Sequence, residues 1–277
     1  MRRELLTDDW PRPAVMGVVN VTPDSFSDGG AYSSPADAAA TARGMLEDGA
    51  SIVDVGGEST RPGAADVSED EELRRVVPVL ELLEGCPVSV DTSRANVARR
   101  ALALGATMVN DVTALRREPQ LAEVVAEAGA GLCLMHMQGE PRTMQDAPHY
   151  ADVVSEVAAF LEERLSAAVA AGVAEDRICL DPGFGFGKTA DHNLELVRQL
   201  DRIVAIGRPV LVGLSRKWTL ARVVAGPEAR IGTDAASVGA AVAAFDRGAS
   251  IFRVHDVRSH VEALAVAAAV ERGTVGT

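Results

Sequence analysis

The chain has 277 residues, of which 47% are hydrophobic and 24% are charged, so it can bury a full core and is not intrinsically disordered. Its formal net charge of −13 excludes nucleic-acid backbones and anionic membranes as general partners, and an anionic substrate would need a local cluster of cations. Residues 1–13 contain no apolar run of signal-peptide length, and no stretch approaches the ~18 uninterrupted apolar residues of a membrane span. The three cysteines, Cys86, Cys133 and Cys179, have no C-x-x-C spacing and fit reduced core residues. We therefore expect a soluble, cytoplasmic protein.

Short apolar segments alternate with helical segments from one end of the chain to the other. The first apolar run ends at Asn20, and further strands are expected over residues 51–57, 87–91, 107–112, 131–137, 177–181, 209–215 and 250–255. Helices are expected over residues 34–50, 68–83 and 94–105, after Pro119, and over 153–173, 192–207, 234–245 and 261–270. Two starts carry clear helix signals, namely Ser34 before Pro35 and the capping-box spacing of Ser68 and Glu71.

These segments make eight strand–helix alternations at roughly 30-residue spacing. The strands are short and apolar with little alternation, as expected for parallel strands that helices cover on the outside. A doubly wound open sheet is the alternative, but eight units without a topological break favour a closed barrel. We predict an α/β protein with a single (β/α)8 TIM-barrel domain over residues 14–273, preceded by an N-terminal extension of residues 1–13.

Polar side chains stand at or just beyond the end of each predicted strand. They are Asn20, Asp54, Asp91, Asn110 with Asp111, His136, Asp181, Lys217, and Arg253 with His255. The C-terminal strand ends form the catalytic face of a TIM barrel. Each residue alone could cap the turn after its strand, but eight such ends together favour a binding site. A cation cluster would come from Arg61, Lys217, Arg253 and His255. The carboxylates of Asp91 and Asp181 would be costly to bury without hydrogen-bond donors, so we expect a ligand with an N–H-rich ring and a phosphate-like tail.

Other tempting motifs do not match. The run 183–189 resembles a P-loop, but Pro182 occupies the position of its first glycine, and the G-x-G-x-G spacing misses the dinucleotide fingerprint. The five histidines form neither H-E-x-x-H nor an H-x-H pair on the first strand, so a zinc hydrolase is not expected. His149, His192 and His260 are expected to be surface or capping residues.

Long motifs over residues 17–256 resemble those of dihydropteroate synthase. Two of them follow the first two strands, NVTPDSFSDGG at 20–30 and DVGGESTRPG at 54–63. The others are DT at 91–92, ND at 110–111, MHMQG at 135–139, DPGFG at 181–185, SRK at 215–217 and RVHD at 253–256. The resemblance implies condensation of 6-hydroxymethyl-7,8-dihydropterin pyrophosphate with 4-aminobenzoate, which gives 7,8-dihydropteroate and pyrophosphate in folate biosynthesis.

The resemblance also implies a role for each motif residue. The pterin ring would be held by Asp91, Asn110, Asp181 and Lys217 and packed by Met135, Phe186 and Gly213. The pyrophosphate would be held by Asn20 through Mg²⁺ and by Thr60, Arg61, Arg253 and His255. The aminobenzoate would be surrounded by Phe26, Pro62 and Ser215. Catalysis would depend on charged groups rather than a nucleophile, namely Asp91, Asp181, Lys217, Arg61, Arg253 and His255.

Two other functions stay open at this point. Methyltransferases that serve corrinoid proteins have related pterin barrels, but they do not need the two N-terminal loops with Phe26, Arg61 and Pro62. A non-catalytic pterin-binding paralogue would be expected to lack Arg61, Lys217 or Arg253, and all three are present.

The segments 234–245 and 261–270 are apolar nearly all round, whereas an outer barrel helix should be polar toward water. This pattern predicts a homodimer formed through the seventh and eighth helices, and members of the resembled family are commonly dimeric. The alternative is that abundant alanine only reflects good helix formers at tolerant surface positions.

Overall fold

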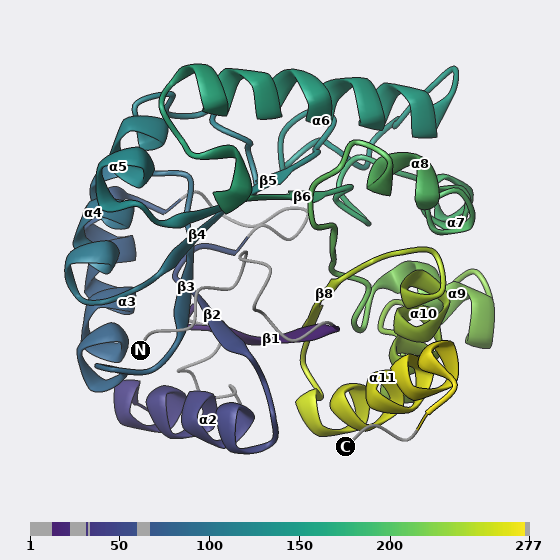
Figure 1. Cartoon of the computed structure of the whole chain (residues 1–277), viewed down its shortest axis with the longest axis horizontal. Coiled ribbons are helices and arrows are strands. Elements are labelled where there is room, and N and C mark those ends of the chain that lie inside the picture. Colours follow the sequence, from purple (N-terminus) through teal and green to yellow (C-terminus); the bar gives the residue numbers. More distant parts are fainter. Residues whose placement is uncertain (1–12, 23–31, 33, 60–66, 275–277) are drawn as a thin grey trace.

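The computed structural model describes residues 13–22, 32, 34–59 and 67–274, which form a ring of strands inside a ring of helices (Figure 1). Eight parallel strands follow one another in the order β6-β5-β4-β3-β2-β1-β8-β7. They are β1 Ala14–Asn20, β2 Ile52–Gly56, β3 Val88–Asp91, β4 Met108–Asp111, β5 Gly131–Met135, β6 Ile178–Asp181, β7 Leu211–Val212 and β8 Ile251–Val254. A bridge between Leu180 and Val210 joins the two ends of the ring, which confirms the TIM barrel.

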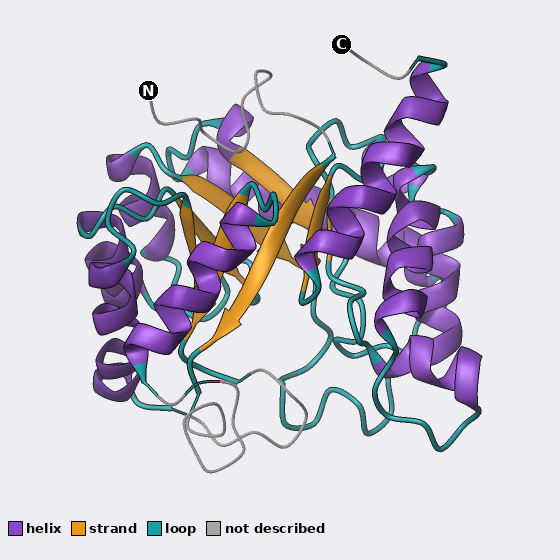
Figure 2. Ribbon diagram, turned by 90° about the horizontal axis from the view of Figure 1, so that it is seen from below, coloured by secondary structure: helices purple, strands orange, loops and turns teal. Residues whose placement is uncertain are grey.

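The helices lie outside the strands on all sides, as Figure 2 also shows. They are α2 Pro35–Glu47, α3 Glu69–Leu82, α4 Ala95–Ala103, α5 Leu121–Ala128, α6 Val153–Ala170, α7 Ala190–Arg198, α8 Asp201–Val204, α9 Trp218–Ala225, α10 Asp234–Phe245 and α11 Val257–Arg272. The predicted start signals are confirmed, because the Ser34 and Ser68 hydroxyls accept the backbone N–H groups of Asp37 and Glu71 at 3.2 and 3.3 Å.

The barrel interior has an apolar layer below a polar one. The apolar layer is a buried cluster of Ala14, Met16, Ile52, Met108, Cys133, Cys179, Leu211 and Ile251. Side chains two residues apart in a strand share a face, so the next inward residues are Asp54, Asn110, Met135, Asp181 and Arg253. A larger hydrophobic core lies between strands and helices. The apolar layer therefore fills the barrel and leaves the polar layer at its C-terminal mouth.

Three local expectations are wrong. The strand expected over 209–215 is only Leu211–Val212, because the chain then turns, with Arg216 at a φ of 57° and the Lys217 N–H donating to the Leu214 carbonyl at 3.1 Å. The helix expected over 192–207 is interrupted at Gln199, where φ is −113°. His260 is buried in α11 rather than exposed; its Nδ1 lies 2.6 Å from the Asp256 carbonyl oxygen, while its Nε2 is buried with no partner among the described residues.

Across the described ranges, the helices are all too short or too polar to cross a membrane. Cys133 and Cys179 are buried in the apolar layer of the barrel, and both carry free thiols, as does Cys86. His192 is a capping residue, as expected, since it completes a capping box with Thr189 at the start of α7.

Candidate active site

The polar layer at the barrel mouth is aligned by the register of the strands. Asp91 at the end of β3 pairs with Gly56 on one side and with Asn110 on the other. Met135 pairs with Asp181 in the same way. Residues far apart in the sequence therefore end at one level, as their positions at strand ends predicted.

Arg253 is the central cation of the mouth. Its Nε donates to Asp54 Oδ2 at 2.7 Å, and one terminal nitrogen donates to Asp91 Oδ2 at 2.9 Å. Asn110 Nδ2 also donates to Asp54 Oδ2, at 2.9 Å. The two carboxylates outnumber the single guanidinium in this group, so this part of the mouth favours donors and positive charge in a ligand.

Two buried acceptors in the same group have no protein partner. Asp54 Oδ1 and Asn110 Oδ1 are buried side-chain oxygens that accept no hydrogen bond within the described part of the chain. A buried acceptor without a donor costs free energy, and a ligand N–H group would remove that cost. The mouth thus fits the predicted N–H-rich ring.

Asp91 titrates in an unusual range for a carboxyl group. Burial raises its pKa to about 7, with Asp54 adding to the rise and Arg253 opposing it. The side chain is 12% exposed. Asp91 therefore exchanges its proton near neutral pH, where a bound cationic or N–H-donating ligand would hold it ionised.

Asp181 is the second titrating carboxyl group and lies at the end of β6. Its Oδ1 accepts the backbone N–H of Gly183 at 2.7 Å. Burial raises its pKa to about 6, against the lowering effects of the Gly183 amide, Lys217, Lys188 and Arg253. Gly183 has a φ of 68°, and a Cβ there would lie 1.9 Å from the carbonyl oxygen of His136, so only glycine permits this turn.

A cation and an apolar wall stand beside Asp181. Lys217 Nζ lies 4.4 Å from the centre of the Phe186 ring, a cation–π distance. Phe186 packs against a buried cluster of Val112, Met135, Met137 and Met144. These side chains form a flat apolar surface with a positive edge, which suits a heteroaromatic ring with polar substituents.

Ser215 and His255 meet on the other side of the mouth, after β7 and β8. Ser215 Oγ lies 3.0 Å from His255 Nδ1 and accepts the His255 backbone N–H at 3.2 Å. Gly213 is half-buried, and a Cβ there would meet no atom within 4 Å, so the backbone is open to a ligand. Asn20 is also half-buried, at the end of β1.

A family model described as "Pterin binding enzyme" matches residues 16–255. The chain belongs to this family. Dihydropteroate synthase from Escherichia coli (strain K12) is 48% identical over 262 residues, which cover 93% of this chain and 92% of that protein. The solved structure of Xanthomonas albilineans dihydropteroate synthase with 4-aminobenzoic acid is 48% identical, has a TM-score of 0.85, and covers 94% of this chain and 93% of that one. The same organism's enzyme in complex with 7,8-dihydropteroate is 45% identical, with a TM-score of 0.82 and 94% coverage of both chains.

Most of the predicted site residues of this pterin-binding barrel meet at its mouth. Those in the described part of the chain are Asn20, Asp91, Asn110, Met135, Asp181, Phe186, Gly213, Ser215, Lys217, Arg253 and His255. The remaining four, Phe26, Thr60, Arg61 and Pro62, lie outside the described residues. Their predicted contacts with pyrophosphate and aminobenzoate therefore stay predictions.

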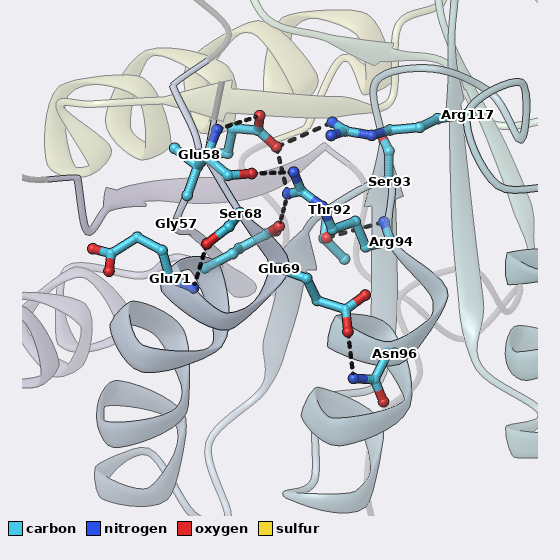
Figure 3. A network of polar contacts seen from close by, with 12 residues as sticks. Gly57, Glu58, Ser68, Glu69, Glu71, Thr92, Ser93, Arg94, Asn96 and Arg117 are labelled. Carbon is cyan, nitrogen blue, oxygen red and sulfur yellow. Dashed lines mark hydrogen bonds and ion pairs between the residues drawn. The ribbon is translucent and has the colours of Figure 1, made fainter. Parts of the chain in front are cut away.

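A network of ion pairs links Glu58 and Val67 to Glu72, Arg94 and Arg117, and we call these five residues the Arg94 cluster. Figure 3 shows the guanidinium groups of Arg94 and Arg117 pointing toward Glu58, at 2.8 and 3.2 Å from its Oε2. Arg94 also pairs with the fully buried Glu72 and donates to the Val67 carbonyl. The chain before and after residues 60–66 is thus joined through one buried arginine.

Three residues of the site region have no role implied by the sequence motifs. Asp54 is predicted only as a strand-end carboxylate, and its bonds to Arg253 and Asn110 place it in the site. Arg94 and Lys188 are both buried cations that hold loops next to the mouth. A usable signal existed for Asp54, since an acidic residue inside the apolar strand β2 must find donors in the barrel.

Proposed function

We infer that the chain is a transferase that condenses 6-hydroxymethyl-7,8-dihydropterin pyrophosphate with 4-aminobenzoate to give 7,8-dihydropteroate and pyrophosphate. The observation that best supports this function is that Asp91, Asp181, Lys217 and Arg253 lie together at the mouth of the barrel. It occurs in a chain that is 48% identical to Escherichia coli dihydropteroate synthase over nearly its full length.

The pterin would bind against Phe186 and Met135, with its polar edge toward Asp181 and Lys217. An ionised Asp181 accepts N–H groups of the ring, and Lys217 donates to ring oxygen or nitrogen acceptors. The buried Asn110 Oδ1 and Asp54 Oδ1 add two acceptors without protein partners. This set recognises a ring that carries several N–H groups, as a dihydropterin does.

The pyrophosphate would bind where Arg253 and His255 follow one another along the last strand and its loop. Two N–H groups of Arg253 bond to Asp54 and Asp91, which leaves three of the five guanidinium donors for phosphate oxygens. Arg61 and Thr60 are proposed to complete this subsite. Charge on the departing pyrophosphate would then be stabilised by cations already in place.

Magnesium is the proposed cofactor, and the residues present fit it. Mg²⁺ prefers oxygen ligands and usually keeps several waters while binding substrate phosphates, so it needs few protein ligands. The Asn20 carboxamide at the end of β1 would supply one such oxygen. When bound, the ion would neutralise charge on the leaving group.

The chemistry requires no protein nucleophile. The bond between the pterin methylene carbon and the pyrophosphate oxygen breaks with its electron pair going to pyrophosphate, a bond from that carbon to the aminobenzoate nitrogen forms, and the nitrogen gives one proton to solvent water. Ionised Asp91 and Asp181 favour positive charge on the pterin, so we propose that C–O cleavage runs ahead of C–N formation. An arylamine is already neutral at pH 7 and needs no strong general base. Ser215 is proposed to line the aminobenzoate site together with Phe26 and Pro62.

We also propose a homodimer through α10 and α11, the helices with apolar surfaces in the sequence. Val266 and Val270 on α11 are 65% and 76% exposed, and such apolar exposure favours a covered surface. Changing Val242 and Val266 together to glutamate should give monomers in sedimentation experiments, because each would place a charge in the contact. A monomeric unmodified protein at micromolar concentration would contradict the dimer.

The direct test incubates purified protein with the dihydropterin pyrophosphate, 4-aminobenzoate and Mg²⁺ and measures dihydropteroate. The wild-type protein should form it, and Asp181→Asn should not. A pterin-binding paralogue would bind the pterin without forming product. A methyltransferase would instead demethylate methyltetrahydrofolate when given a corrinoid acceptor, and we expect no such activity.

A further inference from the structure

Lys188 is a fully buried lysine at the end of the glycine-rich run between β6 and α7. Its Nζ lies 2.8 Å from His136 Nδ1, 2.9 Å from the Gly183 carbonyl oxygen and 3.0 Å from the Phe186 carbonyl oxygen. A fourth acceptor, the His136 carbonyl, lies at 3.4 Å. An ammonium group has three N–H donors and no acceptor, so it matches this set of partners.

Every hydrogen-bond partner of Lys188 is electrically neutral. The pKa of His136 is lowered to about 2 by burial, by Lys188 and by Arg116. The ring is therefore neutral, and its Nδ1 can accept a hydrogen bond. Burial lowers the pKa of Lys188 to about 7, while the nearby Asp181 acts against that lowering. No carboxylate in the described ranges forms an ion pair with Lys188, so its charge is left to act on Asp181.

Lys188 donates to the carbonyl groups of His136, Gly183 and Phe186, and these three residues line or adjoin the proposed pterin site. The Gly183 N–H bonds Asp181, Phe186 carries the ring beside Lys217, and His136 directly follows Met135. Movement of Lys188 would therefore displace the carboxylate and the apolar wall together.

The choice of lysine is informative, because only two of the 27 lysine and arginine residues of the chain are lysines. The other lysine is Lys217, at the same site. A compact ammonium can be surrounded by carbonyls on three sides, whereas the planar guanidinium of arginine is longer and directs its donors in a fixed fork. A chain that otherwise uses arginine thus places lysine at a position that demands a point charge.

We propose that Lys188 is a positioning residue of the pterin site, an internal cation that fixes the Gly183 and Phe186 carbonyls and keeps Asp181 ionised to receive the ring. This inference rests on the proposed function, since it assumes a pterin as the ligand of Asp181. Lys188 does not touch the substrate. Its effect passes through the loop and through the charge of Asp181.

The groups that act on the two residues can be named. Lys188 is influenced by Asp181 and Lys217, and it acts in turn on His136 and His192. Asp181 is influenced by Lys217, Lys188 and Arg253. Because Lys217 and Arg253 would both face the ligand, Lys188 is the one cation whose removal changes the field on Asp181 without removing a proposed substrate contact.

The test measures the affinity of 6-hydroxymethyl-7,8-dihydropterin against pH by calorimetry, for the wild type and Lys188→Met. The free alcohol is the probe because it carries no phosphate group that titrates in the same range. If loss of Lys188 raises the pKa of Asp181 by about one unit, the variant should bind about tenfold more weakly at pH 5 and within about twofold of wild type at pH 8.

Tyr150→Phe is the matched control. Tyr150 donates to the carbonyl of Gly187 at 2.7 Å and so supports the same loop without a charge. The plot of pterin affinity against pH for Tyr150→Phe should be parallel to that of the wild type. A Lys188→Met curve that is also parallel, or superimposed on the wild type, would overturn the proposal and leave Lys188 a purely structural residue.

A second measurement does not depend on the folding of Lys188→Met. With only two lysines in the chain, carbon-13 labelling of the lysine ε-carbons gives two signals, which Lys217→Arg assigns. The chemical shift of the Lys188 ε-carbon, plotted against pH, should show an inflection near the pKa of Asp181. The Asp181→Asn variant should lack that inflection. Absence of that inflection in the wild type contradicts the proposal. Failure of the wild type to bind the pterin at any pH would instead contradict the proposed function.

Discussion

Two buried cations hold loops at the barrel mouth, and they differ in how their charge is balanced. Arg94 pairs with the carboxylates of Glu58 and Glu72, and the charges of these three residues and Arg117, the described members of the cluster, sum to zero. Lys188 is held by carbonyls and a neutral imidazole, so its positive charge is not cancelled by a bonded partner. A charge-balanced cluster such as that of Arg94 joins chain segments, whereas an unbalanced buried cation such as Lys188 also shifts the ionisation of a neighbouring carboxyl group.

The largest effect should follow from Arg94→Met. Removal of the guanidinium leaves the fully buried Glu72 as an unpaired charge. Breaking such a buried ion pair costs ~3–5 kcal/mol. Urea unfolding should show this loss, and the double variant with Glu72→Met should recover much of it. A loss below ~1 kcal/mol in the single variant would mean that the Arg94 cluster does not stabilise the fold.

Asp181→Asn should stabilise the unliganded protein while it abolishes activity. The folded-state pKa of Asp181 is about 6 against an ordinary 3.8, so the folded chain binds more protons than the unfolded chain between these values. Wild-type stability therefore falls as pH rises through this window, and the variant lacks this contribution. At pH 7 the variant should be more stable by ~1–3 kcal/mol, with the difference vanishing near pH 4. Equal pH slopes in chemical unfolding of the two proteins would contradict the assignment.

Lys188→Met should change the stability profile on the alkaline side. The pKa of Lys188 is about 7 in the folded chain against an ordinary 10.5, so the unfolded chain binds more protons between these values. Wild-type stability should therefore gain from this group as pH rises from about 7 to about 10, and the variant should lack that gain. Separately, Lys188→Met loses the hydrogen bonds to the buried carbonyl groups, which should lower its free energy of unfolding by ~1–3 kcal/mol at all pH values. Guanidinium unfolding at pH 7 and 9.5 measures both effects, and an unchanged difference between the two pH values would argue against a depressed lysine pKa.

The smallest effect should come from Glu58→Gln. Glu58 is 18% exposed and shares its carboxylate between two arginines, so a neutral amide should cost about 1 kcal/mol. Asn96→Ala is a suitable control, because the exposed Asn96 donates a hydrogen bond to Glu69 beside the same cluster, at 2.8 Å. A Glu58→Gln protein as strongly destabilised as Arg94→Met would show that Glu58, rather than Glu72, is the critical partner.

The fold and much of the site could be predicted because both depend on patterns repeated along the chain. Eight apolar runs with polar ends gave the barrel and its mouth, and Asp91, Asn110, Asp181 and Arg253 all meet there. The ends of elements were less predictable, as in β7, where the chain turns at Leu214 although its sequence remains apolar.

The two cation clusters could not be predicted, because their partners are distant in sequence. Lys188 meets His136 across 52 residues, and Arg94 meets Glu58 and Glu72 across 36 and 22. Such contacts exist only once the barrel has closed. The glycine run before Lys188 fails the P-loop pattern, and no local rule indicates that its lysine turns inward to bind the carbonyls of its own loop.

The central claim is that Asp181 and Lys217 bind the polar edge of a pterin. Calorimetry with the dihydropterin tests it most directly when Asp181→Ala and Lys217→Ala are compared with the wild type at pH 7. A charged hydrogen bond in a buried site is worth ~1.5–3 kcal/mol, so each variant should bind roughly tenfold or more weakly. Unchanged pterin affinity in both variants would contradict the account.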